Sequence, residues 1–344
     1  MKKAMLLNQN ERHAPLPEDI MAEIRAAWAG LELHRYDEAV TDALREDLAR
    51  IYGFPKEDIA ITNGGDGAIE IITTGAARRV EQALIPTPNF SVYDWAAEKA
   101  RLPIRKVPIN LEEGSLPVAD LLAAADRPSL VFLCRPHNPV GDVPAVEQVE
   151  ELAAALPAGS LIMVDEAYIE YGGDPITQWM VGRSDVALLR TFSKALGLAG
   201  LRCGYGVIPE PWRQLALEAS PPFAVANAAL TAARVVLRHL PRLEAEAQEI
   251  ARRREEVFRQ LEAIDGIRPF PSQANFILFQ VRGGPAAAAA LAGALARQEI
   301  FVRTYADDPI ISDCLRVSIG TAEEMEACVA ALQEAAPAAL GEGM

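Results

Sequence analysis

The chain has 344 residues, of which half are hydrophobic and 24% are charged, an ordinary balance for a globular protein. A chain of this length exceeds one ordinary hydrophobic core, so two domains are expected. The net charge of −15 argues against nucleic acid as a partner, because phosphate binding requires clustered lysine and arginine.

The amino terminus predicts neither a secretory leader nor a membrane anchor. Met1-Lys2-Lys3 leads into only four apolar residues before Asn8, too few for the core of a signal peptide. No uncharged apolar run approaches the roughly 18 residues of a membrane span. The four cysteines lack CxxC or CxxH spacing, so we expect buried thiols, no bound metal and a cytoplasmic protein.

Short apolar runs alternate with helical patterns between residues 59 and 207, which is typical of a helix-covered, mostly parallel sheet. The predicted strands are Ile59–Thr62, Gln82–Ile85, Leu130–Cys134, Leu161–Val164, Val186–Leu189 and Gly204–Val207. Open α/β sheets bind ligands beyond the carboxyl ends of their strands. Because each run ends close to a candidate functional residue, we predict one site built from several strand ends.

The pattern changes from about residue 230. A long helical stretch over 230–264 is rich in arginine and glutamate, and strands are predicted at 275–280 and 315–319. The alanine-rich tract after Gly284-Pro285 predicts a short helix that includes Leu291, Leu295 and Ile300. We therefore expect an amino-terminal arm (1–30) packed on the small domain, a large domain (31–235) and a small carboxyl-terminal domain (236–344).

A glycine-rich turn, Asn63-Gly64-Gly65-Asp66-Gly67, follows the first of these strands and precedes an apolar helix. Such a turn exposes backbone N–H groups and the positive end of the helix dipole, which suit a phosphate dianion. Gly65, Asp66 and Gly67 are therefore candidate phosphate-binding residues, with a plain turn as the alternative.

An acidic motif, Asp165-Glu166-Ala167-Tyr168, directly follows the strand at 161–164. A carboxylate in this position can pair with the protonated pyridine nitrogen of a cofactor such as pyridoxal phosphate. That pairing lets the cofactor ring accept electrons from the substrate. Taken alone, the motif is also consistent with a helix N-cap or a surface pair. Its spacing from Asn138 and Lys194 favours the functional interpretation.

The most informative segment runs from Thr191 to Arg202 and reads TFSKALGLAGLR. It sets Lys194 among small residues near a cation. A lysine that binds an aldehyde needs a crowded, cationic, partly dry pocket that lowers its pKa. Ser193 and Arg202 are suited to hold a phosphate, so the segment predicts a pyridoxal-phosphate site, with a surface lysine at a helix start as the alternative.

Segment 191–202 resembles the lysine signature of class II pyridoxal-phosphate aminotransferases, and its full length is similar to the histidinol-phosphate aminotransferase family. The resemblance extends from Asn8-Gln9-Asn10-Glu11 to Gly320-Thr321. It implies the α/β architecture of fold type I, in which helices flank the mostly parallel central sheet of a large domain and a smaller α+β domain follows. It also implies pyridoxal 5'-phosphate as the cofactor.

The resemblance implies a role for each of five residues around the cofactor ring. Lys194 is expected to bind the aldehyde and move the proton, and Asp165 to pair with the ring nitrogen. Asn138 and Tyr168 are expected to hydrogen-bond the phenolic oxygen. Tyr93 is expected to stack on the ring face, with core packing as the alternative.

Three further residues are assigned to the phosphate and the substrate. Tyr36 matches a tyrosine that reaches the cofactor phosphate of a neighbouring subunit, which implies a homodimer with shared active sites. Arg316 is expected to bind the α-carboxylate of glutamate, and Arg303 the phosphate of the substrate. The alternatives are a surface tyrosine for Tyr36 and a solvated strand-end charge for Arg303.

The chain departs from the family pattern at three places. Arg12-His13-Ala14-Pro15 stands where a tyrosine and glycine often close over the substrate, and Gly67 where a glutamate is usual. Arg135 and His137 replace the usual asparagines of the Asn138 loop. A basic residue near the pocket could recruit a different anion, or could simply face water.

The resemblance implies an aminotransferase that converts L-histidinol phosphate and 2-oxoglutarate to imidazole acetol phosphate and L-glutamate. Its partners would be a small-molecule amino donor and a 2-oxo acid. The alternatives are an aminotransferase for aromatic or other amino acids, a threonine-phosphate decarboxylase, and a regulatory protein that binds the cofactor without turnover. Regulatory proteins of that kind commonly lose the residues that Lys194, Asp165 and Arg316 represent here.

Overall fold

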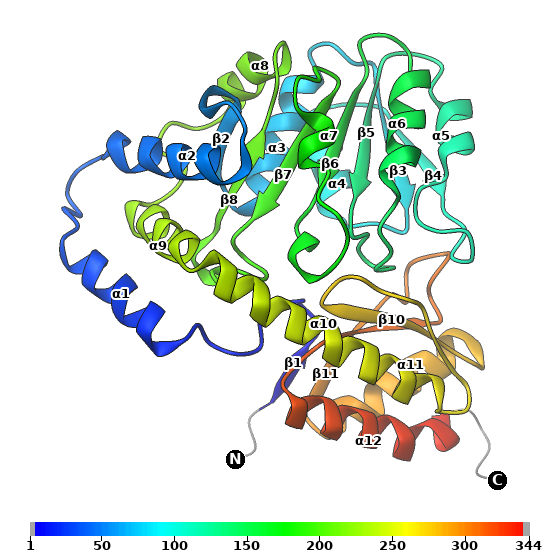
Figure 1. Ribbon diagram of the computed structural model, residues 1–344. Helices are drawn as coiled ribbons and strands as arrows, with labels where there is room; N and C mark the ends of the chain where they lie inside the picture. Colours follow the sequence, from blue (N-terminus) through cyan, green and yellow to red (C-terminus); the bar gives the residue numbers. More distant parts are fainter. Residues whose placement is uncertain (1–3, 340–344) are drawn as a thin grey trace.

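The computed structural model describes residues 4–339, which form two packed units (Figure 1). Residues 1–3 and 340–344, at the ends of the predicted arm and small domain, lie outside the described residues. Helix α10 (Leu240–Glu262) joins the two units. Its amino-terminal end packs in the core of the larger unit, and its carboxyl-terminal end packs in the core of the smaller one.

A seven-stranded sheet with the strand order β2-β8-β7-β6-β5-β3-β4 forms the centre of the larger unit. Its strands are β2 (Ile59–Asn63), β3 (Gln82–Thr87), β4 (Ile104–Pro108), β5 (Ser129–Cys134), β6 (Leu161–Asp165), β7 (Val186–Thr191) and β8 (Cys203–Val207). Neighbouring strands are parallel except at β8, which is antiparallel to β2 and β7. The predicted mostly parallel sheet is therefore confirmed.

Helices cover both faces of this sheet, as Figure 1 shows. One face is covered by α3 (Gly64–Ala76), α4 (Val92–Lys99) and α8 (Trp212–Ala219). The other face is covered by α2 (Glu38–Tyr52), α5 (Val118–Ala124), α6 (Val146–Ala155), α7 (Thr177–Met180) and α9 (Asn227–Arg238). Strands β5, β6 and β7 are buried throughout, which explains their continuous apolar sequences.

The smaller unit has its own core around a five-stranded sheet with the order β1-β11-β12-β10-β9. Its elements are β1 (Met5–Leu7), β9 (Ile267–Pro269), β10 (Phe276–Val281), α11 (Gly284–Arg297), β11 (Ile300–Thr304), β12 (Cys314–Ser318) and α12 (Ala322–Ala339). The predicted short helix is confirmed as α11, but Ile300 begins β11 and does not belong to the helix.

The amino-terminal arm contacts both units. Strand β1 pairs in parallel with β11 of the smaller unit. Helix α1 (Glu18–Ala29) instead packs against α9, and its residues Ile20 and Ile24 join the core of the larger unit. The arm therefore straps the two units together, and the predicted domain boundaries at residues 30 and 235 stay predictions.

The helical stretch predicted over 230–264 is interrupted. Helix α9 ends at Arg238 and α10 begins at Leu240, with Pro241 in its first turn. Proline lacks a backbone N–H and clashes with the preceding turn inside a helix, so the chain breaks at His239. No helix within residues 4–339 is both long and apolar enough to cross a membrane. All four cysteines are buried and free.

Helices α3 and α8 pack closely at Gly75. A Cβ atom added there would lie 2.6 Å from the backbone nitrogen of Ala216. We expect Gly75→Ala to lower the free energy of unfolding by about 1–3 kcal/mol, because the backbone of α8 has to move. Gly30→Ala is the control, since its Cβ would meet only the Ala27 carbonyl at 3.8 Å. Equal melting temperatures for the two variants would contradict this packing.

Candidate active site

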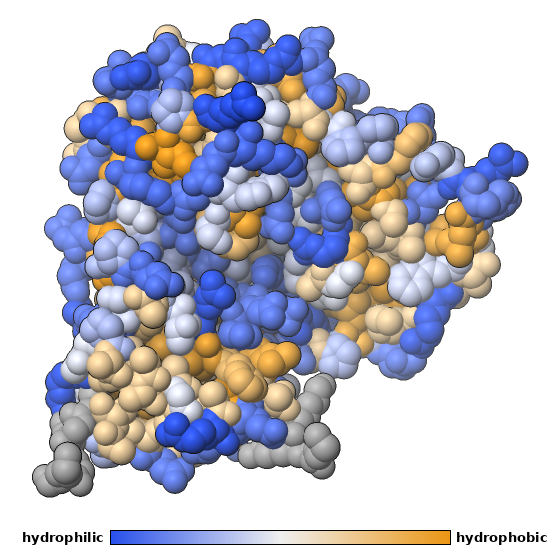
Figure 2. Space-filling view, turned by 180° about the vertical axis from the view of Figure 1, so that it is seen from behind, coloured by the Kyte–Doolittle hydropathy of each residue, from blue (hydrophilic) through white to orange (hydrophobic). Residues whose placement is uncertain are grey.

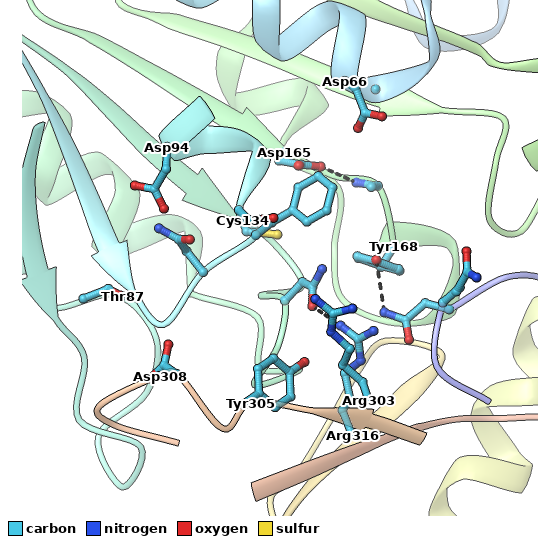
Figure 3. A pocket seen from close by; sticks show the side chains of 18 of the residues that line it. Asp66, Thr87, Asp94, Cys134, Asp165, Tyr168, Arg303, Tyr305, Asp308 and Arg316 are labelled. Atoms are coloured by element: carbon cyan, nitrogen blue, oxygen red, sulfur yellow. Dashed lines mark hydrogen bonds between the residues drawn. The ribbon is translucent and has the colours of Figure 1, made fainter. Parts of the chain in front are cut away.

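A cavity of about 1490 Å³ lies between the carboxyl ends of the large-sheet strands and the smaller unit. Asp66, Asp165 and Tyr168 face Arg303, Tyr305 and Arg316 across it (Figure 3). Figure 2 shows hydrophilic residues gathered across the waist of the molecule, between the two units. Most predicted site residues line the cavity: Gly65, Asp66, Asn138, Asp165, Tyr168, Ser193, Lys194, Arg202, Arg303 and Arg316.

Lys194 lies in the turn after β7, and its amine enters the cavity. Nζ donates a hydrogen bond to the Gln9 carbonyl at 3.1 Å and lies 5.6 Å from the centre of the Tyr168 ring. Burial lowers the pKa of Lys194 to about 8, and the charge of Arg316 acts in the same direction. A substantial fraction of the amine is therefore neutral near pH 8, as a nucleophile requires.

Asp165 ends β6 and is 4% exposed. Burial raises the pKa of its carboxyl group to about 6, while hydrogen bonds from Tyr93 and from the Ala167 N–H oppose that shift. The group is therefore mostly ionised at neutral pH. A buried anion in this position is suited to a protonated ring nitrogen.

A phosphate cradle lies where α3 begins. The Arg202 guanidinium donates hydrogen bonds to Asp66 Oδ2 at 2.9 Å and to Ser193 Oγ at 3.3 Å. Gly64 has a φ of +70°, and a Cβ there would lie 2.6 Å from Arg202 Nη2, so this turn requires glycine. A helix amino terminus, a guanidinium and a hydroxyl together suit a dianion. Gly67, also predicted for this cradle, lies inside α3 and does not line the cavity.

Arg316 on β12 connects the smaller unit, the larger unit and the arm. Its guanidinium donates to Asn138 Oδ1 and, at 2.9 Å, to the Asn8 carbonyl. The bond to Asn138 leaves that amide's nitrogen to donate elsewhere. Arg303 is the β-sheet partner of Arg316 on the antiparallel strand β11. The two cations therefore lie side by side at the cavity.

The arm supplies cavity residues that had no assigned role from the sequence. Asn10 donates through Nδ2 to the Tyr168 hydroxyl at 3.2 Å and accepts from Ser318 Oγ at 2.9 Å. Its φ of +54° is left-handed, a conformation that asparagine tolerates better than most residues. Only the similarity of the segment 8–11 to the family pointed to the arm.

The groups around the cavity fit pyridoxal phosphate. An amine that is partly neutral near pH 8, a buried carboxylate and a cationic cradle match an aldehyde, a ring nitrogen and a phosphate, respectively. In this arrangement Lys194 would hold the aldehyde end, Asp165 the ring nitrogen, and Ser193 and Arg202 the phosphate.

Tyr93 does not line the cavity, in contrast to the stacking position that the resemblance implied. Its hydroxyl donates to Asp165 Oδ2 at 2.7 Å. In this segment the aromatic ring that lines the cavity belongs to Phe90, just before α4. Phe90 could have been suggested by its place after the strand and the Pro88-Asn89 turn, but Tyr93 offered the same ring chemistry.

Tyr36 is 81% exposed and does not line the cavity of its own chain. Its ring stacks on Phe223 with the ring centres 4.4 Å apart. Phe223 is also exposed. The two rings therefore form an aromatic surface patch outside the site.

The substituted basic residues do not add an anion site to the cavity. Arg135 is buried, and its guanidinium contacts Glu166, which also binds Arg190. The Glu166 carboxylate has no access to water, so it needs cationic partners within the core. His137 is also buried, and burial lowers its pKa to about 4, which keeps it neutral.

The altered arm residues are also held by contacts within the chain. Arg12 donates to the Ala195 carbonyl at 3.2 Å and pairs with Glu246 of α10. His13 contacts Glu324 at 3.2 Å. Neither residue lines the cavity. From the sequence, such a residue was expected either to recruit a different anion or to face water, and these two residues do neither.

Comparisons with known proteins agree with this geometry. Residues 2–332 match the family model described as aminotransferase class I and II. Histidinol-phosphate aminotransferase of Symbiobacterium thermophilum is 35% identical over 98% of this chain and 91% of its own. The structure of the Sinorhizobium meliloti histidinol-phosphate aminotransferase in complex with pyridoxal-5'-phosphate is 27% identical, with a TM-score of 0.87 over 97% of this chain and 91% of that one.

A further solved structure shares the fold alone. L-threonine-O-3-phosphate decarboxylase from Porphyromonas gingivalis is 20% identical, with a TM-score of 0.82 over 96% of this chain and 98% of that chain. The same backbone architecture therefore accompanies more than one reaction, so the reaction has to be argued from the site residues.

The lowered pKa of Lys194 can be tested in cofactor-free protein. We expect acetylation of Lys194 by acetic anhydride to rise with pH around a midpoint near 8, below the ordinary lysine value of 10.5. Arg316→Gln removes a neighbouring positive charge and should move the midpoint to higher pH. Mass spectrometry of the Lys194 peptide measures both. A midpoint near 10.5 in the unmodified chain would contradict the burial argument.

Proposed function

Because the chain belongs to the aminotransferase class I and II family, we propose that it transfers the amino group of L-histidinol phosphate to 2-oxoglutarate. The products are imidazole acetol phosphate and L-glutamate. The protein is a pyridoxal-phosphate-dependent aminotransferase. The substrate assignment is supported by near full-length similarity to histidinol-phosphate aminotransferases, and the observation that carries it is the pair of adjacent cations, Arg303 and Arg316, at the cavity.

The bound cofactor supplies an aldehyde that links to amines and a ring that accepts electron density from the substrate's α carbon. Lys194 Nζ would hold that aldehyde, and its amine would be free to act as a base once the amino substrate takes its place. As a partly neutral amine it removes the proton from the α carbon. Asp165 would hold the proton on the ring nitrogen, because its carboxylate is buried and mostly ionised at neutral pH.

Two guanidinium groups let one pocket accept two different anionic substrates in turn. Arg316 binds the α-carboxylate of glutamate or 2-oxoglutarate, for which its hydrogen bonds to Asn138 and Asn8 hold it in place. Arg303 binds the phosphate of the amino substrate. Planar guanidinium groups pair with both anions through two parallel hydrogen bonds.

We extend the proposal to a homodimer with shared active sites in the cytoplasm. Leu33, Tyr36 and Phe223 are large apolar residues that are 85%, 81% and 51% exposed. An exposed group of this kind typically marks an interaction surface. In the dimer, Tyr36 would reach the cofactor phosphate of the other subunit. Four buried, free thiols support a reducing compartment.

A panel of amino donors tested with 2-oxoglutarate should single out L-histidinol phosphate. Lys194→Ala should abolish both turnover and the visible absorbance of lysine-bound cofactor, because no amine remains to hold the aldehyde. Lys99→Ala, which alters an exposed lysine paired with Glu70, is the control. Preference for an aromatic amino acid would overturn the substrate assignment. Release of carbon dioxide without an oxo-acid acceptor would indicate a decarboxylase.

Arg303→Ala should separate the two anions. We expect KM for L-histidinol phosphate to rise about 10- to 100-fold, the loss typical of one charge-assisted interaction. KM for glutamate should change by less than about threefold, because Arg316 remains. Steady-state kinetics of both half-reactions provide the measurement. Equal losses for both substrates would show that Arg303 does not distinguish phosphate.

A further inference from the structure

Tyr93 is packed behind the cavity wall. Its ring is 2% exposed, meets Phe90 edge-on with the ring centres 5.8 Å apart, and lies 5.1 Å from Phe132 of β5. Tyr93 therefore cannot stack on a ligand in the cavity, because Phe90 lines the cavity and Tyr93 does not. The Tyr93 ring therefore contributes only to core packing, and a phenylalanine ring would fill the same space.

The hydroxyl group of Tyr93 has a more specific partner. It donates to Asp165 Oδ2 at 2.7 Å, while the backbone N–H of Ala167 donates to Oδ1 at 2.9 Å. Each carboxylate oxygen therefore receives one hydrogen bond from the protein. Two fixed donors restrict rotation of the carboxylate about its Cβ–Cγ bond and so fix the plane it presents to the cavity.

In this pair Tyr93 is the hydrogen-bond donor and Asp165 is the acceptor. Burial holds the pKa of Tyr93 well above its ordinary value, so the phenol keeps its proton and acts as the donor. A donor to a carboxylate stabilises the ionised form. Asp165 needs that support, because burial acts against its ionisation. The other ionisable groups near Asp165 are Asp66, Lys194, Cys134 and Tyr168.

We infer that Tyr93 is a positioning residue that holds the Asp165 carboxylate ionised and oriented toward the ring nitrogen of the cofactor. It acts through Asp165 and touches neither cofactor nor substrate. The inference rests on the role proposed above for Asp165. It deepens that role by giving the carboxylate a dedicated hydrogen-bond donor on α4.

A cofactor analogue isolates this role from packing. The 1-deaza analogue of pyridoxal phosphate has carbon in place of the ring nitrogen, so it cannot pair with Asp165. Cofactor-free protein is titrated with each compound and the dissociation constants are compared. Tyr93→Phe should weaken binding of pyridoxal phosphate about tenfold or more, the loss expected when a buried charged group loses a hydrogen bond. Binding of the deaza analogue should change by less than about twofold.

Tyr171→Phe is the matched control, since Tyr171 is fully buried and its hydroxyl has no hydrogen-bond partner within residues 4–339. It should leave both dissociation constants unchanged. Equal weakening of both compounds by Tyr93→Phe would indicate a packing role and overturn the inference, as would no weakening at all.

Asp165→Asn separates this inference from the function on which it rests. The variant should lose the preference for pyridoxal phosphate over the deaza analogue. If it keeps that preference, the role of Asp165 itself is wrong, and the inference about Tyr93 is overturned with it. If Asp165→Asn loses the preference while Tyr93→Phe retains it in full, only the inference about Tyr93 is overturned.

Discussion

The burial of Lys194 beside Arg316 is the constraint on which the site depends. A lysine amine in water stays charged at neutral pH and cannot attack a carbonyl carbon. Two cations in one partly dry cavity disfavour each other, and the lysine yields because its proton can leave, whereas a guanidinium keeps its charge. Arg316 is held in this arrangement by the hydrogen bonds that it donates to Asn138 and Asn8.

The site exists only when three separate parts of the chain meet. The large sheet supplies Asp165 and Lys194 from neighbouring strands, the smaller unit supplies Arg316, and the arm supplies Asn10. The parallel strands explain the first contribution, because their carboxyl ends share one edge of the sheet. The arm joins the two units, since its strand β1 extends the sheet of the smaller unit and its helix α1 packs in the core of the larger unit. Assembly of the site is thus tied to completion of the whole fold.

Most of the fold could be predicted because the central strands are buried on both faces and leave uninterrupted apolar sequences. The edge strand β4 (Ile104–Pro108) was missed, because only Val107 in it is buried and the strand therefore has no apolar run. The break at His239 was missed because helical sequence patterns lie on both sides of it, in α9 and in α10. In the site, the motif residues Asn138, Asp165 and Lys194 line the cavity, and their roles stay predictions. Tyr93 was predicted in place of Phe90 because the two aromatic residues lie three positions apart, just before and within α4, and have the same ring chemistry.

The buried contact of Arg135 and Arg190 with Glu166 bears on how freely this chain can change during evolution. Replacing Arg135 alone leaves one balanced pair, but replacing Glu166 alone would strand two guanidinium groups in the core, a loss of several kcal/mol. An arginine at position 135 therefore entrenches the glutamate at 166. Glu166 adjoins Asp165, the residue proposed to pair with the cofactor. Arg135 brings no new ligand to the cavity, yet it limits the mutations that position 166 tolerates.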